Sequence, residues 1–155
     1  MTQIALDSNI LIYLAGLWRS ESDRPKIARA NNVIGKLRLS HDLFAPIQAL
    51  GETFSVLRRN GNSAEFCREV VLELSHGLGT ANSSSATLAG AFDIVVEHKL
   101  QFWDALIVTA AAEAECSMLL SEDMQDGFVV RGLTIVNPLK DDPHPKLARL
   151  LASSP

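Results

Sequence analysis

The sequence has few aromatic residues, few cysteines and no excess of positive charge. Aromatic side chains make up 6% of the 155 residues, there are 2 cysteines, and the formal net charge is −4. Proteins that hold nucleic acid mainly by neutralising phosphates are usually basic, so this charge argues against that class. An acidic chain can still bind nucleic acid where metal ions carry the positive charge.

Long apolar runs, a secretory signal and paired cysteine motifs are also lacking. The longest apolar runs fall short of the ~20 residues that span a bilayer, and the first residues, MTQIALDSN, lack the basic-then-apolar order of a signal peptide. Cys67 and Cys116 show no metal or redox spacing, so we expect reduced, buried thiols. These features predict a cytoplasmic protein with no membrane association.

The sequence does contain an alternation of short strands and helices. Apolar residues make up 47% of the chain, which is typical of a globular domain, and we expect one domain at 1–139 followed by a polar tail at 140–155. The expected strands are 3–6, 43–45, 117–121 and 133–137, with a Gly/Ser loop at 76–86. The expected helices are 9–18, 25–38, 46–59, 63–75 (with Asn62 as N-cap, after a C-terminal Gly61), 84–98, 103–115 and 145–152. This order predicts an α/β fold, a three-layer α/β/α sandwich with a central, mainly parallel sheet.

Acidic residues follow the predicted strands or begin a predicted helix. Asp7 and Asp123 come after strands, so both belong at the carboxyl edge of the sheet, where such folds bind ligands. Asp104 begins a helix, where the dipole favours an anion, and a purely structural role would explain it equally well. Glu52 lies off the apolar face of its predicted helix, which favours a solvated carboxylate, paired with Arg59 if with any residue.

Carboxylates that meet at one edge of a sheet repel each other. At ~4 Å and an effective dielectric of ~20, each pair costs ~4 kcal/mol. Bound protons or a divalent cation would relieve this repulsion, and an all-oxygen site suits Mg²⁺ or Mn²⁺.

Four segments of the chain together resemble PIN-domain nucleases, in particular the VapC-type toxins of bacterial type II toxin–antitoxin modules. They are LDSNILIYLA, ALGETFSVLRR, FWDALIVTAAAEAECSMLLSEDMQDG and GLTIVNP. The resemblance implies that Asp7, Glu52, Asp104 and Asp123 are the catalytic acids. It further implies that Asp7, Asp104 and Asp123 hold Mg²⁺ or Mn²⁺ for RNA cleavage.

Other residues beside these acids are candidates for supporting roles. Ser8, Asn9 and Ser121 would orient the acids by hydrogen bonds or simply cap helices, and Asp126 would be an outer partner of the metal site. Arg19, Arg58 and Arg59 are candidates for RNA contact, although two of them end a helix, where cations are favoured anyway.

The resemblance also implies partners, and it leaves alternatives. VapC-type toxins form homodimers and bind an antitoxin, for which the helices at 9–18 and 25–38 would form groove walls. A housekeeping PIN-domain nuclease is the main alternative. A phosphoacceptor signalling domain would need paired acids after the first strand and a late lysine, which ALDSN and LTIVNP lack. A catalytically silent binding module is the third alternative, although the presence of all four acids argues against it.

Overall fold

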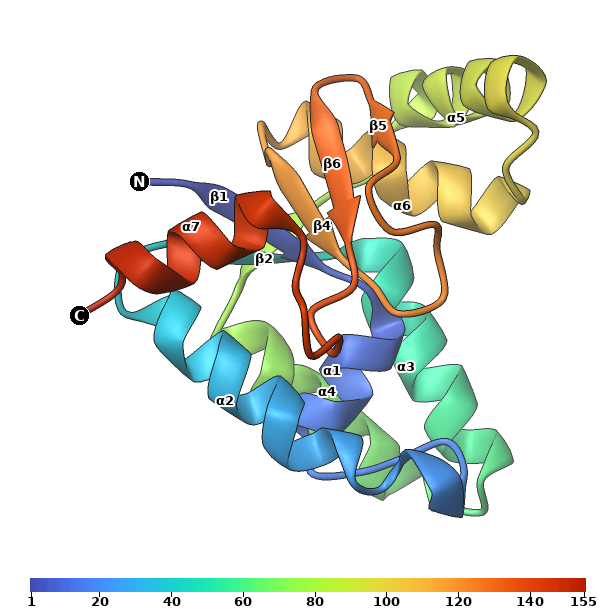
Figure 1. The fold of residues 1–155 in the computed structure, drawn as a ribbon. Coiled ribbons are helices and arrows are strands. Elements are labelled where there is room, and N and C mark those ends of the chain that lie inside the picture. The colour runs from blue at the N-terminus through green and yellow to red at the C-terminus, as the bar shows by residue number, and fades with distance from the viewer.

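The computed structural model describes residues 1–155 and contains a six-stranded sheet with helices on both faces (Figure 1). The strand order is β3-β2-β1-β4-β6-β5, and all neighbours are parallel except β5, which runs antiparallel to β6. The strands are β1 (Gln3–Leu6), β2 (Asp42–Pro46), β3 (Gly79–Ala81), β4 (Met118–Leu120), β5 (Val129–Val130) and β6 (Leu133–Val136). The predicted fold class, a three-layer α/β/α sandwich, is confirmed.

Seven α-helices connect and cover the strands. They are α1 (Ser8–Leu14), α2 (Lys26–Arg38), α3 (Ile47–Arg59), α4 (Ala64–His76), α5 (Ser85–His98), α6 (Phe102–Glu113) and α7 (Pro145–Ser153), with a short 3₁₀ helix at Glu21–Asp23. Helices α2 and α7 lie on one face of the sheet, and α6 lies on the other with α5 packed against its outer side (Figure 1).

Burial on both faces explains the composition of the central elements. Ile4, Ala5 and Leu6 of β1 are completely buried, as expected for a parallel strand that helices cover on each side. Every residue of α6 from Ala105 to Ala111 is buried, and its small side chains allow close approach to the sheet. Two of the predicted acids lie at the ends of these elements: Asp7 follows β1, and Asp104 lies in the first turn of α6.

Two strands were not predicted from the sequence. The segment 76–86 was expected to be a loop, but Gly79–Ala81 forms β3 and pairs with β2 through Phe44 and Gly79. The residues that form β5 were also assigned to no element, yet they pair with β6. A two-residue strand and a Gly-Thr-Ala segment show neither alternation nor an apolar run of useful length, so pairing with a neighbour defines both strands.

Two of the helix ends that differ from the prediction have a clear local cause. Helix α1 ends at Leu14 rather than Trp18, because Gly16 adopts a φ of 76° and the chain turns there. The N-cap of α4 is Ser63, whose hydroxyl accepts a hydrogen bond from the backbone N–H of Phe66. Asn62 instead donates to the Leu57 carbonyl at the end of α3, so its polar side chain finishes one helix rather than starting the next.

Both cysteines are free and buried, as predicted. None of the helices has the length and apolar character that crossing a bilayer requires.

Candidate active site

Asp7 lies where β1 passes into α1, at the carboxyl edge of the sheet. It caps α1 by accepting a hydrogen bond from the Ser8 N–H (2.7 Å), and it also accepts from the Ser121 hydroxyl (2.7 Å). Ser121 is adjacent because β1 pairs in parallel with β4, which ends at Leu120. Asp7 is 3% exposed. Burial raises the pKa of Asp7 to about 6; hydrogen bonds from Ser121 and Ser8 oppose this rise, and the charges of Asp104 and Glu52 add to it.

Glu52 reaches the same edge of the sheet from α3. The Ser8 hydroxyl donates to its Oε2 (3.2 Å) and the Gln48 amide donates to its Oε1 (3.3 Å). The side chain is therefore half-buried and held by polar neighbours, and it makes no ion pair with Arg59. The expectation of a freely solvated carboxylate was wrong because a helical wheel does not include the residues that face Glu52 from α1.

Asp104 lies in the first turn of α6 and is half-buried. Burial raises its pKa, and the negative charges of Glu52 and Asp123 raise it further. Its carboxylate accepts no hydrogen bond from the protein, whereas its backbone N–H donates to Gln101, the N-cap of α6. Asp104 thus contributes an unpaired carboxylate to a region that already contains negative charge.

Asp123 follows β4 by three residues and connects to Asp7 through Asn9. The Asn9 amide donates to Asp7 Oδ2 and to Asp123 Oδ2, each at 3.3 Å, and Asn9 is itself buried. The side-chain Oδ1 of Asn9 accepts from the Glu122 N–H (3.2 Å), which fixes the turn after β4. Asn9 therefore links the two strand ends that carry Asp7 and Asp123.

A hollow of about 440 Å³ opens beside these acids. Its lining comes from α1, the segment between α1 and α2, α3, the start of α6 and the turn after β4. It comprises Ser8, Arg19, Gln48, Gly51, Glu52, Ser55, Val56, Arg59, Trp103 and Asp123. Acidic and cationic side chains both line it, so it presents carboxylates together with groups that attract phosphate.

The donor set is chemically suited to a hard divalent cation. All four acids provide oxygen, and burial together with neighbouring negative charge raises the pKa values of Asp7 and Asp104. No three of the acidic, His or Cys side chains lie at metal-binding spacing in this arrangement. Of the four acids, Asp123 is the one that forms an ion pair, because Arg19 donates to its Oδ2 at 2.6 Å.

The remaining predicted residues divide between the hollow and other places. Arg19 and Arg59 line the hollow, whereas Arg58 donates to the Asn62 carbonyl at the end of α3 (2.8 Å). Asp126 contacts none of the four acids; it accepts from the Asn137 N–H (2.8 Å) and pairs with Lys140 (3.0 Å), which fixes the loop before β5.

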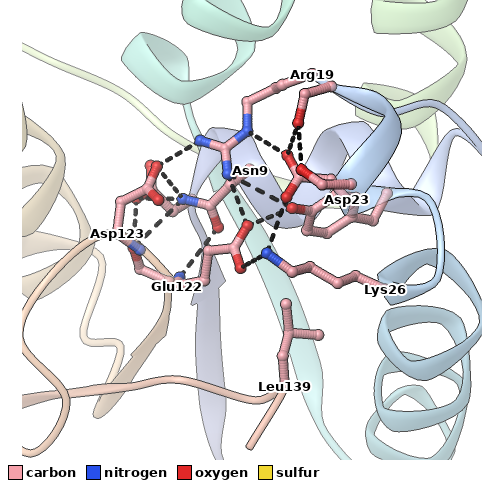
Figure 2. A network of polar contacts seen from close by, with 12 residues as sticks. Asn9, Arg19, Asp23, Lys26, Glu122, Asp123 and Leu139 are labelled. Carbon is pink, nitrogen blue, oxygen red and sulfur yellow. Dashed lines mark hydrogen bonds and ion pairs between the residues drawn. The ribbon is translucent and has the colours of Figure 1, made fainter.

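A network of charges beside the acids was not predicted from the sequence. Figure 2 shows Glu122 at its centre, bonded to Arg19 (2.7 Å), Lys26 (2.9 Å) and the Tyr13 hydroxyl, with Asp23 on the far side of Lys26. The one available signal was the position of Glu122 next to Asp123 in the segment SED. Arg19 and Lys26 lie about a hundred residues earlier in the chain, and no local pattern connects them to that segment.

Comparison with known families identifies the fold. The model of the PIN domain family matches residues 4–125. This chain belongs to the PIN domain family. The matched range contains Asp7, Glu52, Asp104 and Asp123.

Solved structures of PIN-domain proteins have the same fold. VapC20 of Mycobacterium tuberculosis, a toxin that cleaves the sarcin–ricin loop, is 15% identical, and the alignment covers 77% of this chain and 91% of that one with a TM-score of 0.61. The VapBC2 structure from Rickettsia felis, bound to a DNA fragment from its promoter, is 14% identical, with coverage of 86% and 97% and a TM-score of 0.65. Among curated protein sequences, none matches significantly.

Proposed function

We propose that this chain is a cytoplasmic, metal-dependent endoribonuclease and the toxin of a toxin–antitoxin pair. The observation that carries the proposal is the meeting of Asp7, Glu52 and Asp104 at one edge of a PIN-domain sheet, where burial and the charge of Glu52 raise the pKa values of both Asp7 and Asp104. Buried acids that repel each other are unfavourable without a cation, so this arrangement is suited to binding one.

In this proposal Asp7, Asp104 and Asp123 hold Mg²⁺ or Mn²⁺, and Glu52 assists. When bound, the ion would neutralise charge on the phosphodiester and activate the attacking water. Asn9 and Ser121 donate hydrogen bonds that hold Asp7, while Ser8 holds Glu52, so these side chains fix the donor oxygens. Arg59 and Arg19 at the hollow would contact RNA phosphates. Arg58 and Asp126 do not line the hollow; in this proposal Arg58 would contact RNA outside it, and Asp126 would be an outer partner of the metal site.

The proposed protein partners also have structural support. A second hollow, of about 370 Å³, lies between α1, α2 and α4, and is lined by Leu14, Ile34, Leu74 and other residues of mixed character. A segment of an antitoxin could be received there, between the helices that the sequence indicated as groove walls. We further propose that the chain acts as a homodimer, and that the nuclease domain is residues 1–139 with a tail at 140–155 whose helix α7 packs against the domain.

Cleavage of RNA by the purified protein tests the nuclease proposal directly. Wild type should cut a mixed cellular RNA in the presence of Mg²⁺ or Mn²⁺ and not in EDTA, and Asp7→Asn or Asp104→Asn should lower the rate by a factor of 100 or more, on the order expected for loss of a metal ligand. Sequencing the new RNA ends would identify the cleavage site. Full activity in either purified, folded variant would remove the carboxylates from the mechanism.

Expression in a bacterial host separates a toxin from a housekeeping nuclease. Wild type should arrest growth, Asp7→Asn should not, and the small protein encoded beside its gene should relieve the arrest. Unimpaired growth with demonstrable RNA cleavage in vitro would favour the housekeeping alternative.

A further inference from the structure

Arg19 forms an ion pair with Asp123, one of the acids of the proposed metal site. One terminal nitrogen of its guanidinium donates to Asp123 Oδ2 (2.6 Å) and the other to Glu122 Oε1 (2.7 Å). Arg19 belongs to the segment that joins α1 to α2, so this contact closes the segment over the turn after β4 (Figure 2). Asp123 is thereby the only one of the four acids paired with a cation.

The two halves of this contact differ in strength. The Glu122 side chain is 9% exposed and is bonded to Lys26 and Tyr13 as well as to Arg19. The Asp123 side chain is 55% exposed, and its only other side-chain partner is Asn9. Solvent screens the outer ion pair more than the inner one, so the Arg19–Asp123 contact opens at lower cost than the Arg19–Glu122 contact.

Arg19 is also incompletely satisfied in this position. Its Nε is buried without a hydrogen-bond partner, and the nearest Asp23 oxygen is 3.7 Å away. A buried donor without a partner costs free energy, which favours rearrangement of the guanidinium when another cation competes for Asp123.

We propose that Arg19 is a tethered competitor of the divalent cation: it neutralises Asp123 in the unloaded protein, and it releases Asp123, while Glu122 retains it, when the cation binds. The inference rests on the proposed function, because it takes the carboxylate site to be a cation site. Two positive charges cannot share Asp123 without repulsion, so Arg19 lowers the affinity of the site for the ion. The consequence is a site that loads only at higher metal concentration.

Mn²⁺ titration of the metal-stripped protein, followed by electron paramagnetic resonance of the free ion, tests this proposal without RNA. Arg19→Gln should bind Mn²⁺ about fivefold more tightly than wild type, the change expected when a competing ion pair of ordinary strength is lost. The matched control is Arg59→Gln, which removes the same charge from the same hollow but breaks no ion pair with an acid. Its affinity should stay within about twofold of wild type, as expected for a screened charge.

Circular dichroism melts would establish that each variant is folded. If Arg19→Gln does not fold, Arg19→Lys replaces it. A single ammonium cannot hold both carboxylates in the same way, so the affinity of Arg19→Lys for Mn²⁺ should exceed that of both wild type and Arg59→Gln.

Each other outcome overturns the inference. Equal gains in Arg19→Gln and Arg59→Gln would mean that only net charge matters. Unchanged or weaker binding by Arg19→Gln, with wild-type binding that Asp7→Asn abolishes, would refute the competitor role and leave the proposed function standing. An absence of Mn²⁺ binding in all variants, wild type included, would refute both.

Discussion

Asp7 combines the capping of a helix with burial that disfavours its charge. Its pKa rises from the ordinary value of 3.8 to about 6, mainly through burial. This difference corresponds to about 3 kcal/mol between the folded and unfolded proteins. Because the folded-state value is the higher one, the native protein binds the extra proton between these two pH values. The favourable contribution is present below pH 4 and is lost as the pH rises through about 6.

Asp7→Asn should therefore stabilise the metal-free protein at neutral pH. We expect the free energy of unfolding at pH 7.5 to increase by about 1–3 kcal/mol, because Asn keeps the shape and some hydrogen bonds without the buried charge. The difference between variant and wild type should shrink as the pH falls from 6.5 to 4. Urea denaturation across this range measures it, and a difference that did not depend on pH would contradict the proposed charge effect.

At the residue scale, the sequence places some side chains well and others not at all. The position of Asp7 after β1 and of Asp123 after β4 follows from parallel pairing, which any reader of the sequence could anticipate. The hydrogen bond from Ser8 to Glu52 joins residues 44 positions apart, and the Arg19–Asp123 pair joins residues 104 apart. Such contacts depend on how the helices dock, which periodicity does not encode.

At the scale of elements, β3 depends on the absence of a side chain at Gly79. A Cβ at this position would lie 2.6 Å from the ring of Phe44, the residue it pairs with on β2. This approach explains why a segment rich in Gly and Ser, which local sequence assigns to a loop, can join the edge of the sheet.

Gly79→Ala should consequently destabilise the protein, by about 1–3 kcal/mol, since Phe44 or β3 must shift to admit the methyl group. Gly35→Ala is a suitable control because a Cβ there meets nothing within 4 Å and Gly35 lies inside α2. Alanine favours a helix interior over glycine, so the control should gain up to ~1 kcal/mol. Chemical denaturation measures both changes. A Gly79→Ala variant as stable as wild type would show that β3 or Phe44 can shift without lowering the free energy of unfolding.

Elements that carry an apolar run or a cap were more predictable than those that carry neither. The strands β1, β4 and β6 and all seven helices carry apolar runs or caps that the sequence displays, whereas β3 is a Gly-Thr-Ala segment and β5 has two residues. Pairing with β2 and β6 supplies the hydrogen bonds that make them strands, so their existence is a tertiary property.

At the scale of the whole molecule, the last helix belongs to the common core. Leu147 of α7 is completely buried within the main apolar cluster, and Lys146 donates hydrogen bonds to the Ser117 carbonyl and the Thr134 hydroxyl, each at 3.1 Å. The sequence predicted the helix, but the polar residues before it concealed its attachment to the sheet. The family match ends at residue 125, so this attachment lies outside it.

Leu147→Ala should lower the free energy of unfolding by about 2–4 kcal/mol, the usual cost of emptying a buried leucine site. Arg149→Ala, on the exposed side of α7, should change it by no more than ~0.5 kcal/mol. Thermal and urea unfolding would compare them. Equal, small effects of the two substitutions would mean that α7 adds nothing to the stability of the domain.

The hydrogen bond between Asp7 and Ser121 has a consequence for synthesis of the chain. Its two residues are separated by 114 positions, and Asn9 spans the same interval to reach Asp123. A nascent polypeptide held on the ribosome cannot assemble this pair of contacts until the segment around Ser121 has left the exit tunnel. The hydrogen bonds that hold Asp7 and Asp123 in the candidate site therefore form only after most of the chain has been made.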